Sequence, residues 1–202
     1  RKVWRKTVYW AKRYDRARYG DTNRFRAIQD SSVGERVAVL GGGAFGTAMA
    51  TVLARKGYPV SVIVRDPLVC KFINRKHVNP RYLSDYELPK ELTATTQAAE
   101  ALPGCTVVVH AMPVQASRRA LQTMGDLVPH GVPIISVSKG VELGSRELMC
   151  DVIPHALGRA DDDNPVVAVS GPSFAKEIMD RRPTSVVAAS STPSRPLACR
   201  AS

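Results

Sequence analysis

The stretch RVAVLGGGAFGTAMATVLARKG, residues 36–57, decides the fold of this 202-residue chain. It begins with a short apolar run, continues with a cluster of glycines, and ends in a longer segment rich in small residues. We expect a buried strand over the first part and a helix from about residue 45, with the glycines at the turn between them. Gly41, Gly43 and Gly46 have the spacing G-x-G-x-x-G.

Each glycine of this motif has its own physical task. Gly41 permits the tight turn, Gly43 lets the backbone approach a diphosphate, and Gly46 lets the helix lie close to the strand. The start of the helix offers unpaired N–H groups and the positive end of its dipole. The motif therefore predicts a dinucleotide site, and the alternative is a glycine turn that serves packing alone.

A second strand, PVSVIVRD at residues 59–66, follows at the distance expected for a mononucleotide-binding unit. It ends in Arg65 and Asp66. A carboxylate at this point bonds the ribose hydroxyls of NAD, whereas an arginine pairs with the additional phosphate of NADP or stacks on adenine. We expect NAD as the cofactor, with NADP as the alternative.

Apolar strands and helical segments continue to alternate along the chain. Further strands are expected at residues 106–113, 133–140 and 166–172, and helices at 115–128 and 146–157. These strands lack polar alternation, as is typical of parallel strands buried on both faces. The pattern predicts an α/β fold with a doubly wound, mainly parallel sheet. We place this domain at residues 33–190 and an irregular tail at 191–202.

The charge of the chain is concentrated at its beginning. Residues 1–32 contain ten Lys or Arg and three Asp, which accounts for +7 of the net charge of +11. Tryptophans and other apolar residues recur among these cations at helical spacing. We expect a basic helical extension that packs on the domain or acts as a linker. The alternative is contact with a membrane surface or a polyanion.

Several classes of protein are disfavoured by the composition. No run of 18 apolar residues exists, so we expect no transmembrane segment. The four cysteines have no paired metal-type spacing, and the Asp161–Asp163 cluster is better explained as a solvated loop, so no metal site is expected. The basicity is confined mainly to the extension, so nucleic acid is not expected as a partner.

Five segments of the chain resemble NAD(P)-dependent glycerol-3-phosphate dehydrogenases, in the same order and with similar spacing. The resemblance covers residues 36 to about 190, and we expect a Rossmann-type domain there. These segments are VLGGGAFGTAMA, LPKELTATT, HAMPVQ, SVSKGVE and SGPSFAKEI. The additional segments RDPLVCKFIN and HVNPRYL, with the basic extension, are most similar to the plastid-type enzymes of plants and algae.

The resemblance implies a set of site residues. The expected cofactor contacts are Gly41, Gly42, Gly43, Ala44, Phe45, Gly46, Arg65, Lys139 and Ala175. Lys139 is expected beside both nicotinamide and substrate, and Gly171 and Ser173 are expected to contact substrate. From the residues alone, Lys139 is either a ligand group at the carboxyl edge of the sheet or an exposed loop lysine, and Ser173 contacts an anion or caps a helix.

The resemblance also implies the reaction, which interconverts dihydroxyacetone phosphate and sn-glycerol 3-phosphate and feeds glycerophospholipid synthesis. The family's all-helical second domain is expected to be absent, and with it the proton-donating lysine and the main phosphate-binding arginine. No catalytic residue is therefore assigned, and we expect the 202-residue chain alone to be inactive. Further expectations are plastid localisation, with the cytoplasm as alternative, and a homodimer at full length. The alternative function is a non-catalytic nucleotide-binding module with a basic contact helix.

Overall fold

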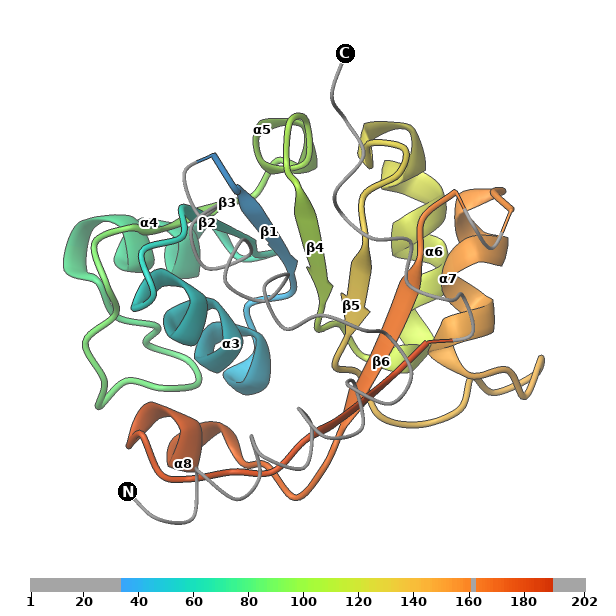
Figure 1. Ribbon diagram of the computed structural model, residues 1–202. Helices are drawn as coiled ribbons and strands as arrows, with labels where there is room; N and C mark the ends of the chain where they lie inside the picture. Colours follow the sequence, from blue (N-terminus) through green and yellow to red (C-terminus); the bar gives the residue numbers. More distant parts are fainter. Residues whose placement is uncertain (1–33, 161–162, 191–202) are drawn as a thin grey trace, which may run out of the picture. The chain divides into compact units, whose positions relative to one another are not determined.

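The computed structural model of the protein describes residues 34–160 and 163–190. In this part a seven-stranded sheet has the order β3-β2-β1-β4-β5-β6-β7 (Figure 1). All neighbouring strands are parallel except β6 and β7, which are antiparallel. The strands are β1 (Val37–Leu40), β2 (Val60–Ile63), β3 (Leu92–Thr95), β4 (Val107–His110), β5 (Ile134–Ser136), β6 (Val166–Ser170) and β7 (Val187–Ala189). The order of the parallel strands is that of a Rossmann-type sheet.

Helices connect the parallel strands and lie on both faces of the sheet (Figure 1). They are α3 (Ala44–Ala54), α4 (Pro67–Lys76), α5 (Ala98–Ala101), α6 (Val114–Met124), α7 (Met149–Leu157) and α8 (Ala175–Met179), with a short 3₁₀ helix η1 (Gly125–Leu127) after α6. The α4 helix begins at the N-cap Asp66 with a proline in its first turn, and His77 ends it in the left-handed conformation. Both features are typical helix boundaries.

Strand β1 shows why the strand segments are mainly apolar. Its four side chains are all buried, and they alternate between two hydrophobic clusters. Val37 and Val39 pack in the cluster that includes residues of α3, α4 and α8, whereas Ala38 and Leu40 pack in the cluster of α6 and α7. Water is excluded from both faces, so both must be apolar. The predicted doubly wound, mainly parallel sheet is therefore confirmed.

All five strands expected from the sequence are present, but two more exist. The LTAT segment of β3 is short and includes an exposed threonine, and the three residues of β7 are all exposed. The LTAT segment has no continuous apolar run, and the run VVAA at residues 186–189 is short and adjoins the polar tail, so the sequence analysis assigned neither to a strand. Both are held by pairing to a neighbour, β3 to β2 and β7 to β6.

Some expectations concern residues outside the described part of the chain. The basic extension at residues 1–32, the tail at 191–202, and two members of the acidic cluster, Asp161 and Asp162, belong there. Within residues 34–160 and 163–190, no helix has the length and apolar character needed to cross a bilayer. The domain boundaries at 32 and 190 stay predictions.

Candidate functional site

The glycine turn joins β1 to α3 at the carboxyl edge of the sheet. Gly41 has a positive φ of 109°, which favours glycine, and an added Cβ would lie 2.6 Å from the carbonyl oxygen of Ala111. A Cβ at Gly46 would lie 2.0 Å from the carbonyl oxygen of Gly41. These two glycines are therefore required by the close approach of helix, turn and strand β4.

Gly43 differs from its neighbours because packing does not require it. Its φ is −70°, which any residue adopts, and a Cβ at this position meets nothing within 4 Å. Gly43 is also the N-cap of α3, so the first amides of that helix follow it. Among the described residues its own N–H has no acceptor. The absence of a side chain here leaves room and donors for an anionic group, and the turn fits a diphosphate.

Lys139 brings three parts of the sheet edge together. It follows β5, and its Nζ donates a hydrogen bond of 2.9 Å to the carbonyl oxygen of Gly171, which follows β6. The same Nζ lies 5.9 Å from the centroid of the Phe45 ring, at the start of α3. The side chain is exposed. Phe45, Lys139 and Gly171 were all predicted as ligand contacts and are separated by up to 126 positions. They thus lie side by side, with the Lys139 ammonium between the other two.

The turn after β6 is tightly built. Gly171 has a φ of 155°, and a Cβ there would lie 2.3 Å from the carbonyl oxygen of Ser185. Ser173 is buried, and its N–H donates to the Gly171 carbonyl oxygen at 2.9 Å, so that oxygen accepts from both Ser173 and Lys139. The N-cap of α8 is Phe174, and Ala175 is its first residue. The interpretation of Ser173 as the helix cap is therefore wrong by one position.

The two charged residues at the end of β2 have different surroundings. One carboxylate oxygen of Asp66 accepts from the N–H of Leu68 at 2.8 Å, which caps α4, and the other lies 3.6 Å from an Arg81 guanidinium nitrogen. Arg65 is exposed. The Asp66 carboxylate thus has structural partners, whereas Arg65 faces solvent at the sheet edge.

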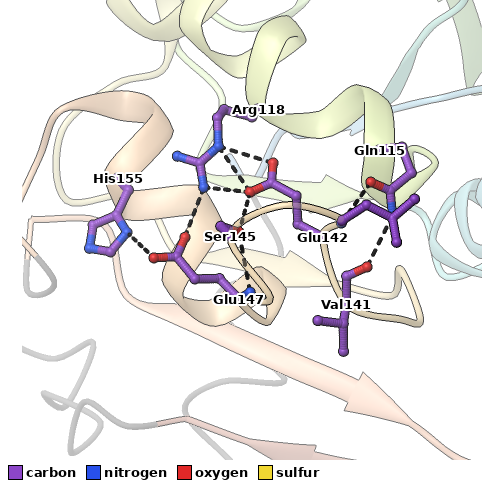
Figure 2. A network of polar contacts seen from close by, with 8 residues as sticks. Gln115, Arg118, Val141, Glu142, Ser145, Glu147 and His155 are labelled. Atoms are coloured by element: carbon purple, nitrogen blue, oxygen red, sulfur yellow. Dashed lines mark hydrogen bonds and ion pairs between the residues drawn. The ribbon is translucent and has the colours of Figure 1, made fainter.

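A network of polar contacts anchors the loop between Lys139 and α7 (Figure 2). The Arg118 guanidinium, from α6, donates to both carboxylate oxygens of Glu142 at 2.6–3.1 Å and to Glu147 at 2.8 Å. Hydrogen bonds from Arg118 and Ser145 hold the pKa of Glu142 below its usual value. On the far side, Glu147 pairs with His155 of α7 at 3.3 Å. The loop that carries Lys139 is therefore tied to two helices.

His110, at the end of β4, is a core residue. Its side chain is fully buried, Nε2 lies 2.9 Å from the Ser117 hydroxyl, and Nδ1 lies 3.3 Å from the Ser136 hydroxyl. The Ser117 hydroxyl donates to the Pro113 carbonyl oxygen, so it accepts from Nε2. Burial lowers the pKa of His110 to about 4, which keeps the imidazole neutral. Its hydrogen bonds are satisfied within the fold.

The sequence analysis did not identify the residues that hold the loops of this site in place. Arg118 and Glu142 are 24 positions apart, and no motif links them. Asn79, from the segment after α4, is completely buried and donates to the Gly42 carbonyl oxygen at 3.0 Å. An asparagine inside an otherwise apolar or turn-rich segment gives no local signal of a distant partner. Among the described residues, no group of three or more His, Cys, Asp or Glu side chains could hold a metal ion.

Comparison with known proteins gives the family. The family model for the NAD-dependent glycerol-3-phosphate dehydrogenase N-terminus matches residues 36–195. This chain belongs to the glycerol-3-phosphate dehydrogenase family. The predicted resemblance and the oxidoreductase class are confirmed.

Individual relatives agree with this family membership. The chloroplastic NAD-dependent glycerol-3-phosphate dehydrogenase of rice, Oryza sativa subsp. japonica, is 43% identical over 94% of this chain and 41% of its own length. A chloroplastic enzyme of Arabidopsis thaliana is also 43% identical, over 93% of this chain and 43% of its own length. The crystal structure of the Coxiella burnetii glycerol-3-phosphate dehydrogenase is 34% identical, with a TM-score of 0.71 over 78% of this chain and 47% of that one. This family member therefore spans less than half the length of each of these three relatives.

Proposed function

We propose that this chain binds a nicotinamide dinucleotide along the carboxyl edge of its sheet. The diphosphate lies at the glycine turn after β1, the adenosine end lies toward Arg65 after β2, and the nicotinamide end lies toward Lys139 after β5. The strand order supports this arrangement, because β2 and β5 lie on opposite sides of β1. The carboxyl edge, where the strand order reverses, is where open α/β sheets bind ligands.

The observation that carries the proposal is the contrast among the glycines of the turn. Gly41 and Gly46 are required by internal contacts, whereas Gly43 fills no internal need and leaves open space. That space adjoins the positive end of the α3 dipole. Names of relatives support a nicotinamide cofactor, since the rice enzyme is called NAD-dependent and bacterial relatives are called NAD(P)-dependent.

We expect NAD as the cofactor, with NADP as the alternative. A substitution at Arg65 distinguishes between the two. The exposed Arg65 guanidinium is available to pair with the additional phosphate of NADP. If NADP binds, Arg65→Gln weakens its affinity about tenfold while the affinity for NAD changes less. Titration of both cofactors with the unaltered chain and the variant gives the preference directly.

The reaction we propose for the whole protein is interconversion of dihydroxyacetone phosphate and sn-glycerol 3-phosphate. A bound nicotinamide supplies or accepts the hydride. The Lys139 ammonium, held by the Gly171 carbonyl oxygen, provides a fixed positive charge that stabilises negative charge on a substrate oxygen or phosphate. Gly171 and Ser173 bring backbone groups to the same place.

This chain by itself is proposed to bind cofactor without appreciable turnover. None of its residues is assigned as the proton donor for the substrate oxygen, and the chain spans less than half the length of its relatives. General acid catalysis alone contributes about 10²- to 10⁴-fold to such a reaction. We therefore expect the substrate to require residues from the remaining length of the family's proteins.

Two measurements test the proposed function. Calorimetric titration of the 202-residue chain with NAD and with ADP-ribose is expected to show saturable binding. NADH oxidation with dihydroxyacetone phosphate is then compared between this chain and a version extended through its natural downstream sequence. Activity only in the extended protein supports the proposal, whereas absence of binding by a folded chain, or robust turnover by residues 1–202, contradicts it.

Location and assembly are also proposals. The chloroplastic names of the rice and Arabidopsis relatives support a plastid location. Microscopy of plant cells that express a fluorescent fusion of the full-length protein checks this, with a diffuse cytoplasmic signal as the contrary result. A homodimer is proposed for the extended protein, and light scattering coupled to gel filtration measures its mass.

A further inference from the structure

Asn79 connects the segment after α4 to the glycine turn. Its side chain is completely buried, and its amide nitrogen donates to the Gly42 carbonyl oxygen at 3.0 Å and to the Thr47 hydroxyl at 2.8 Å. The amide oxygen accepts from the N–H of Arg81 at 3.2 Å. One amide thus bonds the turn, the first part of α3 and its own loop.

The contact with Gly42 determines the direction of the next amide group. The peptide bond between Gly42 and Gly43 is trans and planar, so its carbonyl oxygen and its N–H point in opposite directions. Because Asn79 holds the carbonyl oxygen on its own side, the Gly43 N–H points away from Asn79. That N–H has no acceptor among the described residues, and the position beside it is open.

We propose that Asn79 is a positioning residue of the dinucleotide site, which holds the Gly42–Gly43 peptide so that the Gly43 N–H faces the diphosphate. This inference rests on the proposed function of the glycine turn. Asn79 does not touch the ligand, and it acts through the peptide that does.

The position of Asn79 is set by the fold. The N–H of Leu83 donates to the Asn79 carbonyl oxygen at 3.2 Å, and the Leu83 side chain is buried in the core on the α3 side of the sheet. The guanidinium of Arg81 lies 3.6 Å from the Asp66 carboxylate. The Leu83 side chain in the core and its N–H bond to Asn79 hold this loop in place, so the amide is pre-organised before any ligand arrives.

Asn79→Asp is the sharpest test, because it keeps the shape and the acceptor oxygen and removes the donor. An ionised carboxylate opposite the Gly42 carbonyl oxygen repels it and leaves it only the longer bond of 3.4 Å from the Thr47 hydroxyl. We expect the affinity for ADP-ribose at pH 7.5 to fall about tenfold or more. The affinity for adenosine, which lacks the diphosphate, is expected to stay within twofold. Burial at this position raises the pKa of an introduced carboxyl group, so we expect acidification to pH 5.5 to restore a donor and to recover ADP-ribose affinity relative to the unaltered chain at the same pH.

Asn74→Asp is the matched control. The Asn74 amide also bridges two backbone groups, since it donates to the Ala94 carbonyl oxygen at 2.8 Å and accepts from the Ala94 N–H at 2.7 Å. It joins α4 to β3 and does not contact the glycine turn. We expect Asn74→Asp to lower thermal stability while the affinity for ADP-ribose stays within twofold.

If Asn79→Asp does not fold, Thr47→Val and Thr51→Val replace it. Both threonines are buried on α3. The Thr47 hydroxyl accepts from Asn79 and donates to the Gly42 carbonyl oxygen at 3.4 Å, so it holds the same peptide, whereas the Thr51 hydroxyl donates to the Thr47 carbonyl oxygen and bonds to neither. We expect Thr47→Val to weaken ADP-ribose binding about threefold more than Thr51→Val does.

The possible results separate this inference from the proposed function. If the unaltered chain is folded and does not bind ADP-ribose, the proposed function fails and this inference with it. If the unaltered chain binds and Asn79→Asp binds equally well at pH 7.5, only the positioning role is wrong. An equal loss of ADP-ribose and adenosine affinity also overturns it, because a general loosening of the site affects both. Equal affinities of Thr47→Val and Thr51→Val for ADP-ribose likewise contradict the positioning role.

Discussion

Replacing Gly43 by alanine separates binding from folding in the glycine turn. A Cβ at this position meets nothing within 4 Å, and the φ of −70° suits alanine. The methyl group would occupy the space through which a diphosphate approaches the backbone. Gly43→Ala is therefore expected to fold normally and to bind the cofactor poorly.

The expected stability change follows from two opposing effects. Glycine to alanine at a compatible φ stabilises by about 0.4–1 kcal/mol through the unfolded chain. Alanine is a poorer N-cap than glycine, which costs about 0.5–1 kcal/mol. The two nearly cancel, and since 1 kcal/mol corresponds to about 2–4 °C in a domain of this size, Tm changes by less than about 4 °C. A buried methyl forced against the ligand costs about 1–3 kcal/mol, so NAD affinity falls roughly tenfold or more.

Gly46→Ala is the control, because it is expected to lower the stability of the fold, which Gly43→Ala leaves nearly unchanged. Its Cβ would lie 2.0 Å from the Gly41 carbonyl oxygen and 3.1 Å from the Ala111 side chain, so helix and turn must separate. We expect a loss of about 3 kcal/mol and a Tm lower by about 6–12 °C. Thermal unfolding by circular dichroism and titration with NAD measure the two effects. Unchanged NAD affinity in a folded Gly43→Ala protein would refute the placement of the diphosphate.

Three further substitutions test other parts of the site. Lys139→Met in the extended protein is expected to lower kcat/KM for dihydroxyacetone phosphate about 10²- to 10³-fold in steady-state assays, with ADP-ribose affinity nearly unchanged; a loss below threefold contradicts its electrostatic role. His110 has its pKa lowered from 6.5 to about 4 in the folded state, so its contribution of about 3 kcal/mol is present above pH 6.5 and is lost as the pH falls toward 4. Urea titrations across this range should show a smaller loss in His110→Gln, and equal losses would exclude this source. Arg118 lowers the pKa of Glu142, so its contribution is present above the ordinary carboxyl pKa of about 4.5 and lost below it. Arg118→Met should be less stable at pH 7 and lose less stability on acidification, and parallel curves for the two proteins would contradict this.

The sequence by itself determined the main strands, the glycine turn and the family of this protein. The strands β1, β2, β4, β5 and β6 are visible as mainly apolar segments, because a parallel strand covered on both faces buries most of its side chains. Buried polar side chains such as His110 and Ser136 need hydrogen-bond partners there. The glycine spacing between β1 and α3 is a local pattern in the sequence, although only the structure shows that Gly41 is required by the Ala111 carbonyl oxygen, 70 positions away. The family resemblance also came from short segments in order, and the matching family model confirmed it.

Only the tertiary structure decided which side chains meet. The hydrogen bond from Lys139 to the Gly171 carbonyl oxygen and the ion pair of Arg118 with Glu142 depend on where strands and helices end in space. Strands β3 and β7 likewise exist through their pairing partners. Asn79 is the clearest case, because its partner Gly42 lies 37 positions away. Periodicity and turn chemistry act between near neighbours in the chain, whereas hydrogen-bond partners are chosen by distances that exist only after the sheet has assembled.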